Sequence, residues 1–284
     1  MKHHLLLFLS LIALAACNSS KAPKVADQEH QLVPKWETDS LLKVPESVLF
    51  DKANQVLYVS NVDGTDPWAA DGKGSIGKVG LDGKIIAVDW VSGLDAPKGM
   101  GMYNGKLYVA DLTKLVIIDI PSGKIEKTFP IEGAEGLNDI SIDDKGIVYI
   151  SDTKGKKVYR FQNDRAEVLL KDLKGPNGVL MHDNSFYVLD DGGMYKMNAD
   201  SSLTKIADGM EGGTDGIENV QRNEFIVSAW EGAIWYINAD GTKKVLLDTK
   251  AQKKNTADIG YDPATKTVYV PTFWKNTVVA YEVQ

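Results

Sequence analysis

The chain has 284 residues, and its 32 basic and 39 acidic side chains give a formal net charge of −7. Because nucleic-acid binding requires a basic face, this balance argues against a nucleic-acid partner. The only cysteine is Cys17, which excludes a disulfide within the chain.

The first sixteen residues have the layout of a secretory signal peptide. Met1 and Lys2 give a basic start, and residues 5–16 are apolar except for Ser10. This run is too short for a membrane-spanning helix. It ends in Leu14-Ala15-Ala16-Cys17, which resembles the lipobox of bacterial lipoproteins. We therefore expect cleavage before Cys17 and its lipidation; the alternative is an ordinary signal peptide with an incidental cysteine.

Three regions follow from this organisation: a lipoprotein signal peptide over 1–16, a lipidated cysteine with a flexible tether over 17–35, and one domain over 36–284. The tether is polar and lacks apolar periodicity. No later stretch is long and apolar enough to cross a bilayer. The protein is thus expected to be secreted across the inner membrane and held by lipid, in the periplasm or at the outer membrane.

The domain repeats one pattern six times. Each unit has a strand rich in β-branched and aromatic residues: Leu57-Tyr58-Val59, Leu107-Tyr108-Val109, Val148-Tyr149-Ile150, Phe186-Tyr187-Val188, Phe225-Ile226-Val227 and Val268-Tyr269-Val270. Alignment of the strands that precede them places six residues in one column: Glu46, Lys98, Asn138, Asn177, Asp215 and Ala257. Their intervals of 52, 40, 39, 38 and 42 residues are typical of propeller blades.

The predicted fold class is therefore all-β, a six-bladed β-propeller. A two-sheet sandwich would not produce six copies in register. The last unit stops after Thr277-Val278-Val279-Ala280-Tyr281 without a fourth strand. We expect the segment from Trp36 to Val44 to supply that strand and close the ring, which removes an exposed sheet edge.

The aligned column should surround one mouth of the central channel, because the first strand of each blade lines that channel. Two carboxylates and two amide oxygens would meet there, a donor set that suits Ca²⁺. Zinc suits it less, because no cysteine or histidine lies near this column. Taken singly, Pro176-Asn177-Gly178 and Thr214-Asp215-Gly216 also read as ordinary turns. However, oxygen-bearing side chains stand at the equivalent place in four of the six units, and this repetition favours a shared site.

These residues resemble the gluconolactonase–regucalcin family along nearly all of residues 45–284. The matching stretches are Pro45-Glu46-Ser47-Val48, Leu137-Asn138-Asp139, Pro176-Asn177-Gly178 and Asp215-Gly216. The resemblance implies that Glu46, Asn138, Asn177 and Asp215 bind a divalent metal and that Asp215 is the candidate catalytic base. It also implies hydrolysis of lactones or related esters.

Two departures from the family pattern bear on the substrate. Gly136 stands where sugar lactonases of the family carry an arginine, and Glu46-Ser47-Val48 replaces the common Glu-Gly-Pro. We therefore expect simple sugar lactones to be poor substrates.

Four further residues are expected to line the substrate pocket: Lys98, Trp68, Trp230 and Trp274. Lys98 lies in the central column and either anchors substrate or reaches solvent. Trp68 lies in a long loop over 62–75 that can act as a lid. The tryptophans suit an apolar or ring-shaped ligand, and the alternative role is packing between blades.

The predicted function is a metal-dependent hydrolase of lactones or related esters that is tethered to the membrane by lipid. The competing hypothesis is a non-catalytic, calcium-stabilised propeller that binds a protein, a glycan or a small molecule, since the fold alone does not decide function.

Overall fold

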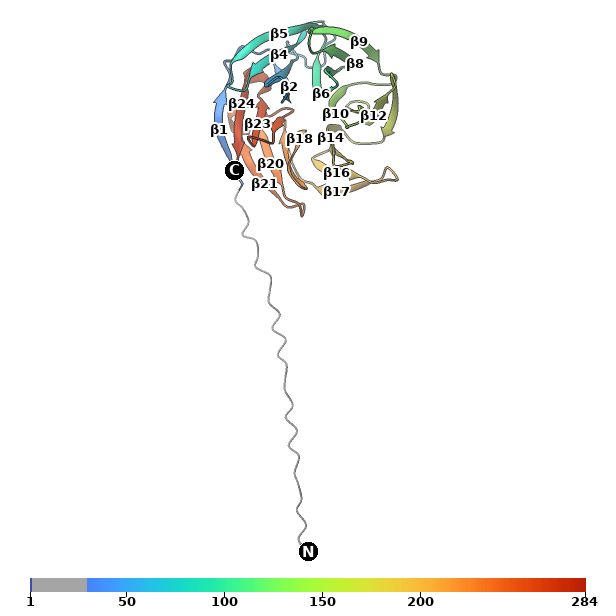
Figure 1. Ribbon diagram of the computed structural model, residues 1–284, viewed down its shortest axis with the longest axis vertical. Helices are drawn as coiled ribbons and strands as arrows, with labels where there is room; N and C mark the ends of the chain where they lie inside the picture. The colour runs from blue at the N-terminus through green and yellow to red at the C-terminus, as the bar shows by residue number, and fades with distance from the viewer. Residues whose placement is uncertain (2–29) are drawn as a thin grey trace.

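The computed structural model describes Met1 and residues 30–284, so the predicted signal peptide and Cys17 lie outside the described residues. Six four-stranded antiparallel sheets are arranged around a common centre (Figure 1). The prediction of a six-bladed β-propeller is confirmed. The described residues contain two short 3₁₀ turns, η1 (Lys250–Gln252) and η2 (Phe273–Lys275). None of their helical segments is long and apolar enough to span a bilayer.

Consecutive sets of four strands form the first five blades. Blades one to three are β2 (Pro45–Asp51), β3 (Val56–Asn61), β4 (Gly74–Gly80) and β5 (Ile85–Leu94); β6 (Pro97–Tyr103), β7 (Lys106–Asp111), β8 (Lys114–Asp119) and β9 (Lys124–Pro130); and β10 (Leu137–Ile142), β11 (Val148–Asp152), β12 (Lys157–Gln162) and β13 (Arg165–Leu170). Blades four and five are β14 (Pro176–His182), β15 (Ser185–Asp190), β16 (Gly193–Met197) and β17 (Leu203–Ala207); and β18 (Thr214–Gln221), β19 (Glu224–Ala229), β20 (Ala233–Ile237) and β21 (Lys243–Asp248).

Blade six joins the two ends of the domain. Its strands are β22 (Gly260–Asp262), β23 (Thr267–Pro271), β24 (Val278–Val283) and the N-terminal β1 (Leu32–Glu37). β1 pairs with β24 in antiparallel register from Leu32 opposite Val283 to Glu37 opposite Val279, so an N-terminal strand closes the ring as predicted.

The closing strand begins earlier than expected. Residues 32–35 belong to β1, whereas the sequence placed them in the tether, and residues 38–44 lie outside the strand. A bulge between Pro34 and Trp36 and the Lys35 side chain interrupt its apolar pattern. Lys35 nevertheless contributes to the fold, because its Nζ donates to Thr267 Oγ1 at 3.0 Å.

The apolar triplets that defined the repeat form the core. Leu57, Tyr58 and Val59 of β3 are each 0% exposed, and their counterparts in the other blades are also buried, except for the half-buried Tyr108. Each hydrophobic cluster spans neighbouring blades; one of them joins Tyr58 and Ile76 of blade one to Met100 and Val109 of blade two. The blades therefore stabilise one another by burying apolar area between sheets.

Candidate functional site

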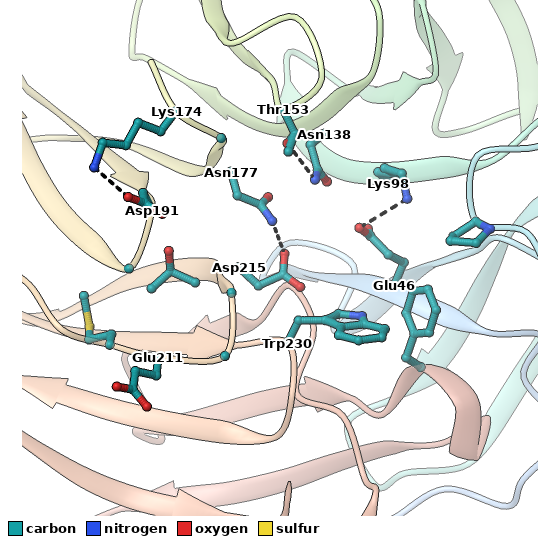
Figure 2. Close-up of a pocket in the computed structure, with 18 of the residues that line it drawn as sticks. Glu46, Lys98, Asn138, Thr153, Lys174, Asn177, Asp191, Glu211, Asp215 and Trp230 are labelled. Carbon is teal, nitrogen blue, oxygen red and sulfur yellow. Dashed lines mark hydrogen bonds and ion pairs between the residues drawn. The ribbon is translucent and has the colours of Figure 1, made fainter.

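A cavity of about 730 Å³ opens at one mouth of the channel. Five residues of the predicted column line it: Glu46, Lys98, Asn138, Asn177 and Asp215. Each is the second residue of the innermost strand of its blade. In Figure 2 these side chains reach from different blades into the same space.

A β-bulge aims each of these side chains. In all five innermost strands the register with the second strand shifts directly after the first residue, as between Pro45 and Ser47 or between Thr214 and Ile217. A bulge re-aims a side chain and locally ends strand pairing. The repeated bulge therefore turns the second residue of each strand toward the mouth.

Aspartates at the ends of three second strands hold the turns that precede these bulges. Asp111 accepts hydrogen bonds from the backbone N–H groups of Asp95 and Ala96, at 2.8–3.1 Å. Asp152 and Asp190 do the same for the turns before Asn138 and Asn177. An aspartate recurs at the end of β7, β11 and β15. This recurrence is visible in the sequence and could have predicted the turns, but the sequence analysis did not use it.

We call the five side chains that reach the mouth the ring: Glu46, Lys98, Asn138, Asn177 and Asp215. Three polar contacts hold its members in place. Lys98 Nζ lies 3.7 Å from Glu46 Oε1, and both side chains are almost fully buried. Asn177 Nδ2 donates to Asp215 Oδ1 at 2.9 Å. Asn138 Nδ2 donates to Thr153 Oγ1 at 3.1 Å. Thr153 was not foreseen, yet it fixes the Asn138 amide, because its own hydroxyl donates to Pro176 O at 2.6 Å and leaves only an acceptor for Asn138.

Two buried oxygens in this ring have no hydrogen-bond partner within the described part of the chain: Glu46 Oε2 and Asn177 Oδ1. A buried acceptor left unpaired costs free energy unless a ligand satisfies it. Among residues 30–284 no three His, Cys, Asp or Glu side chains form a metal-binding group. A cation here would therefore be held by two carboxylates together with the two amide oxygens, a set of hard donors that fits a hard divalent ion.

The carboxyl groups of the ring are hard to ionise without such a cation. Burial raises the pKa of Asp215 well above its usual range, and the Glu46 carboxylate adds to the shift. Burial also raises the pKa of Glu46, although the Lys98 ammonium opposes this. A nearby positive charge favours the ionised form of a carboxyl group. Cation binding should therefore release protons from the ring.

The long loop of blade one reaches over to blades two and three. The Trp68 ring lies 4.3 Å from Lys98 Nζ and 4.2 Å from Lys154 Nζ, measured to the ring centroid. A Cβ at Gly136 would approach the Trp68 ring and the Lys154 side chain to 2.9 Å. Trp68 and Lys154 thus occupy the space beside Gly136, and the absence of a side chain there permits this.

Trp230 lines the cavity as expected, but the aromatic residue from blade six is Phe273 and not Trp274. Phe273 has a φ of 48° in η2, which turns its ring inward and leaves it 2% exposed. Its ring meets Trp230 edge-on at 5.5 Å. Trp274 follows it onto the rim and is 42% exposed, so it lies beside the pocket and outside its wall.

A second cavity, of about 240 Å³, lies among the innermost strands and shares no lining residue with the first. Asp139, Glu218 and Asp258 line it. Ser47 Oγ donates to Asp258 Oδ2 at 2.5 Å. Burial raises the pKa of Asp258 to about 8, with a further contribution from the Glu46 carboxylate. Burial likewise raises the pKa of Glu218 to about 8, and the charge of Asp258 adds to this.

Solved structures share this architecture. A virginiamycin B lyase from Staphylococcus aureus with quinupristin has a TM-score of 0.62 at 11% identity, covering 89% of this chain and 99% of that chain. A streptogramin B lyase gives 0.64 at 11% identity, covering 90% and 98%. A Bacteroides thetaiotaomicron protein of unknown function gives 0.62 at 14% identity, covering 86% and 70%. At these identities the likeness shows the fold alone.

No curated protein matches the sequence. The sequence model of the SMP-30/gluconolactonase/LRE-like region matches residues 44–213, which is more than half of the chain. The match includes Glu46, Asn138 and Asn177, and Asp215 lies two residues beyond its end. The chain belongs to the SMP-30/gluconolactonase/LRE-like family.

Proposed function

We propose that the protein is a metal-dependent hydrolase of lactones or related esters. The observation that carries this proposal is the convergence of four oxygen-bearing side chains on one cavity, with Glu46 Oε2 and Asn177 Oδ1 buried and unpaired there. Membership of a family whose members are often metal-dependent supports it.

Glu46, Asn138, Asn177 and Asp215 would hold the divalent ion, for which Ca²⁺ is the best chemical match. When bound, such an ion supplies Lewis-acid polarisation of a carbonyl and stabilises an oxyanion. Asn177 fixes Asp215 by occupying Oδ1, which leaves Oδ2 as the free carboxylate oxygen. That oxygen can accept a proton from a water molecule that attacks the substrate. Trp230 and Phe273 supply an apolar wall against which a ring-shaped substrate can pack.

A panel of lactones and esters incubated with the purified protein, with calcium or with a chelator, tests the proposal. We expect calcium-dependent ring opening, with simple sugar lactones among the poorer substrates. The exposed tryptophans on the rim favour the second candidate function, a binding protein for a small molecule, glycan or protein. Tight binding of a rim ligand without hydrolysis of any compound on the panel would establish that function instead.

Calcium is expected to raise the melting temperature of the protein, because an ion bound only by the native state stabilises it. Glu46→Gln removes one ligand charge and should lower calcium affinity by roughly tenfold or more, since ligand charge sets affinity in such sites. The melting temperature measured against calcium concentration reports both effects. Glu211→Gln is the matched control, because Glu211 lines the same cavity outside the ring. Equal calcium responses of Glu46→Gln and the unmodified protein would contradict the ligand assignment.

We further propose that lipid on Cys17 anchors the protein to the membrane after export. Cys17→Ser should therefore move the protein from the membrane fraction to the soluble fraction or block processing of the signal peptide. Cell fractionation followed by immunoblotting measures this. A serine variant that is processed normally and stays with the membrane would rule out the anchor.

A further inference from the structure

Within residues 30–284 the buried cation Lys98 has one ion-pair partner, Glu46, and that contact is long. Its side chain is 3% exposed, and its Nζ lies 3.7 Å from the nearest carboxylate oxygen, Glu46 Oε1, which is longer than a hydrogen bond. Its ammonium also lies over the face of Trp68, at 4.3 Å, and its charge acts on the Asp215 carboxyl group. A cation over a ring face is favourable but uses none of the three N–H donors as a conventional hydrogen bond. These donors remain available to a ligand in the cavity that Lys98 lines.

The charge balance of the ring changes once it holds a divalent cation. Glu46 and Asp215 are the two carboxylates of the ring, and together they neutralise a doubly charged ion. The charge of Lys98 is then uncompensated, although its side chain is buried. A buried charge without a partner is costly, so the loaded ring is complete only when an anionic group joins it.

A second cation packs against the same tryptophan, although it does not line the cavity. Lys154 Nζ lies 4.2 Å from the centroid of the Trp68 ring, against which Lys98 also packs. The other lysine that lines the cavity, Lys174, differs from Lys98 because its Nζ pairs with Asp191 at 2.7 Å, away from the ring (Figure 2). The positive charge available to a ligand therefore lies at Lys98 and Lys154, around Trp68.

We propose that Lys98, supported by Lys154 and Trp68, forms an anion-binding subsite beside the metal ring. The favoured substrates are then lactones or esters that carry a carboxylate. This inference rests on the proposed hydrolytic function and names its substrate class. Trp68 delimits the subsite, and the ammonium of Lys98 donates hydrogen bonds to the substrate carboxylate while the ester carbonyl faces the ring.

The first test uses a compound that the protein cannot hydrolyse. Tetrahydrofuran-2-carboxylate and its neutral carboxamide have the same ring and differ in charge. With calcium present, calorimetric titration should show that the carboxylate binds about ten- to a hundredfold more tightly, the range expected for hydrogen bonds to a charged group. Lys98→Met keeps an unbranched side chain out to the ε position, removes the ammonium, and should bring the two affinities to near parity. Lys174→Met is the matched control and should preserve the preference.

The second test measures turnover of a matched pair of lactones, 5-oxotetrahydrofuran-2-carboxylate and its carboxamide. The preference should appear mainly in KM, and Lys98→Met should remove it without abolishing hydrolysis of the neutral lactone. Lys154→Met, a change at an exposed residue, should weaken the preference by a smaller factor. If the unmodified protein binds both tetrahydrofuran compounds equally, or if Lys98→Met keeps the preference, the subsite is refuted. Absence of all lactone hydrolysis alongside a Lys98-dependent carboxylate preference would refute only the hydrolytic function.

Discussion

Asp215→Asn is expected to lower kcat/KM for lactone hydrolysis by about a thousandfold, because general-base catalysis contributes about 10²- to 10⁴-fold and the variant also loses one ligand charge. The shape of the side chain is preserved, and its amide oxygen can still accept the hydrogen bond that Asn177 Nδ2 gives to Asp215 Oδ1. The loss should therefore come from chemistry and metal affinity rather than from collapse of the ring. Initial rates at saturating calcium, with a lactone identified by the panel, measure it.

The controls for this variant separate catalysis from folding. Asp191→Asn removes another carboxylate from the same cavity, one that pairs with Lys174, and should leave the rate within a fewfold of the unmodified protein. Because burial already raises the pKa of Asp215, the neutral asparagine should not lower the unfolding temperature in the presence of a chelator. Comparable rates for Asp215→Asn and the unmodified protein at saturating calcium would remove Asp215 as the base.

The stability of the metal-free protein is expected to fall as the pH rises from about 5 to 8. Burial raises the pKa of Asp258 and of Glu218 to about 8, whereas both groups ionise near pH 4 in an unfolded chain. Between these values the folded protein binds more protons than the unfolded chain, so the free energy of unfolding decreases with increasing pH. The decrease ends once the pH exceeds the folded pKa. Asp258 alone should account for a loss on the order of 3 kcal/mol.

Asp258→Asn should remove most of this contribution and flatten the pH dependence. Urea unfolding at pH 5 and pH 8, in the presence of a chelator, measures the change. Asp240→Asn is the matched control: Asp240 lies in an exposed turn, and hydrogen bonds from the Thr242 side chain and backbone lower its pKa. Its contribution therefore appears at low pH, and the control should retain the fall above pH 5. An unchanged slope in Asp258→Asn would show that this carboxyl group is ionised in the folded protein.

The architecture could be predicted because it follows from local sequence patterns that repeat along the chain. Apolar triplets such as Leu57-Tyr58-Val59 define the second strands, and their spacing defines the blades. The column of residues from Glu46 to Asp215 could be aligned for the same reason, and the structure brings its five polar members to one cavity.

Features that depend on one residue's backbone or on distant contacts could not be read in this way. Nothing in the pattern distinguishes Phe273 from Trp274 until the left-handed backbone at Phe273 decides which ring turns inward. The reach of Trp68 to Gly136 depends on how a loop of blade one crosses blade two. The start of β1 at Leu32 was missed because only three residues pair before the bulge at Pro34. So short a segment, followed by a lysine, shows no clear alternation of apolar and polar residues.

Because β1 pairs with β24, the domain can complete its folding only after the C-terminal strand has been made. Gln31 and Gln284 exchange backbone hydrogen bonds and a side-chain hydrogen bond although they are 253 residues apart in the chain. Contacts of such long range form slowly, because the chain must first lose the entropy of closing a very large loop. Five blades can assemble in order as the polypeptide emerges, but the sixth must wait for the last strand. A nascent protein therefore leaves the apolar faces of blades one and five, which blade six covers, exposed until synthesis is complete, and this is the interval in which it most needs protection from aggregation.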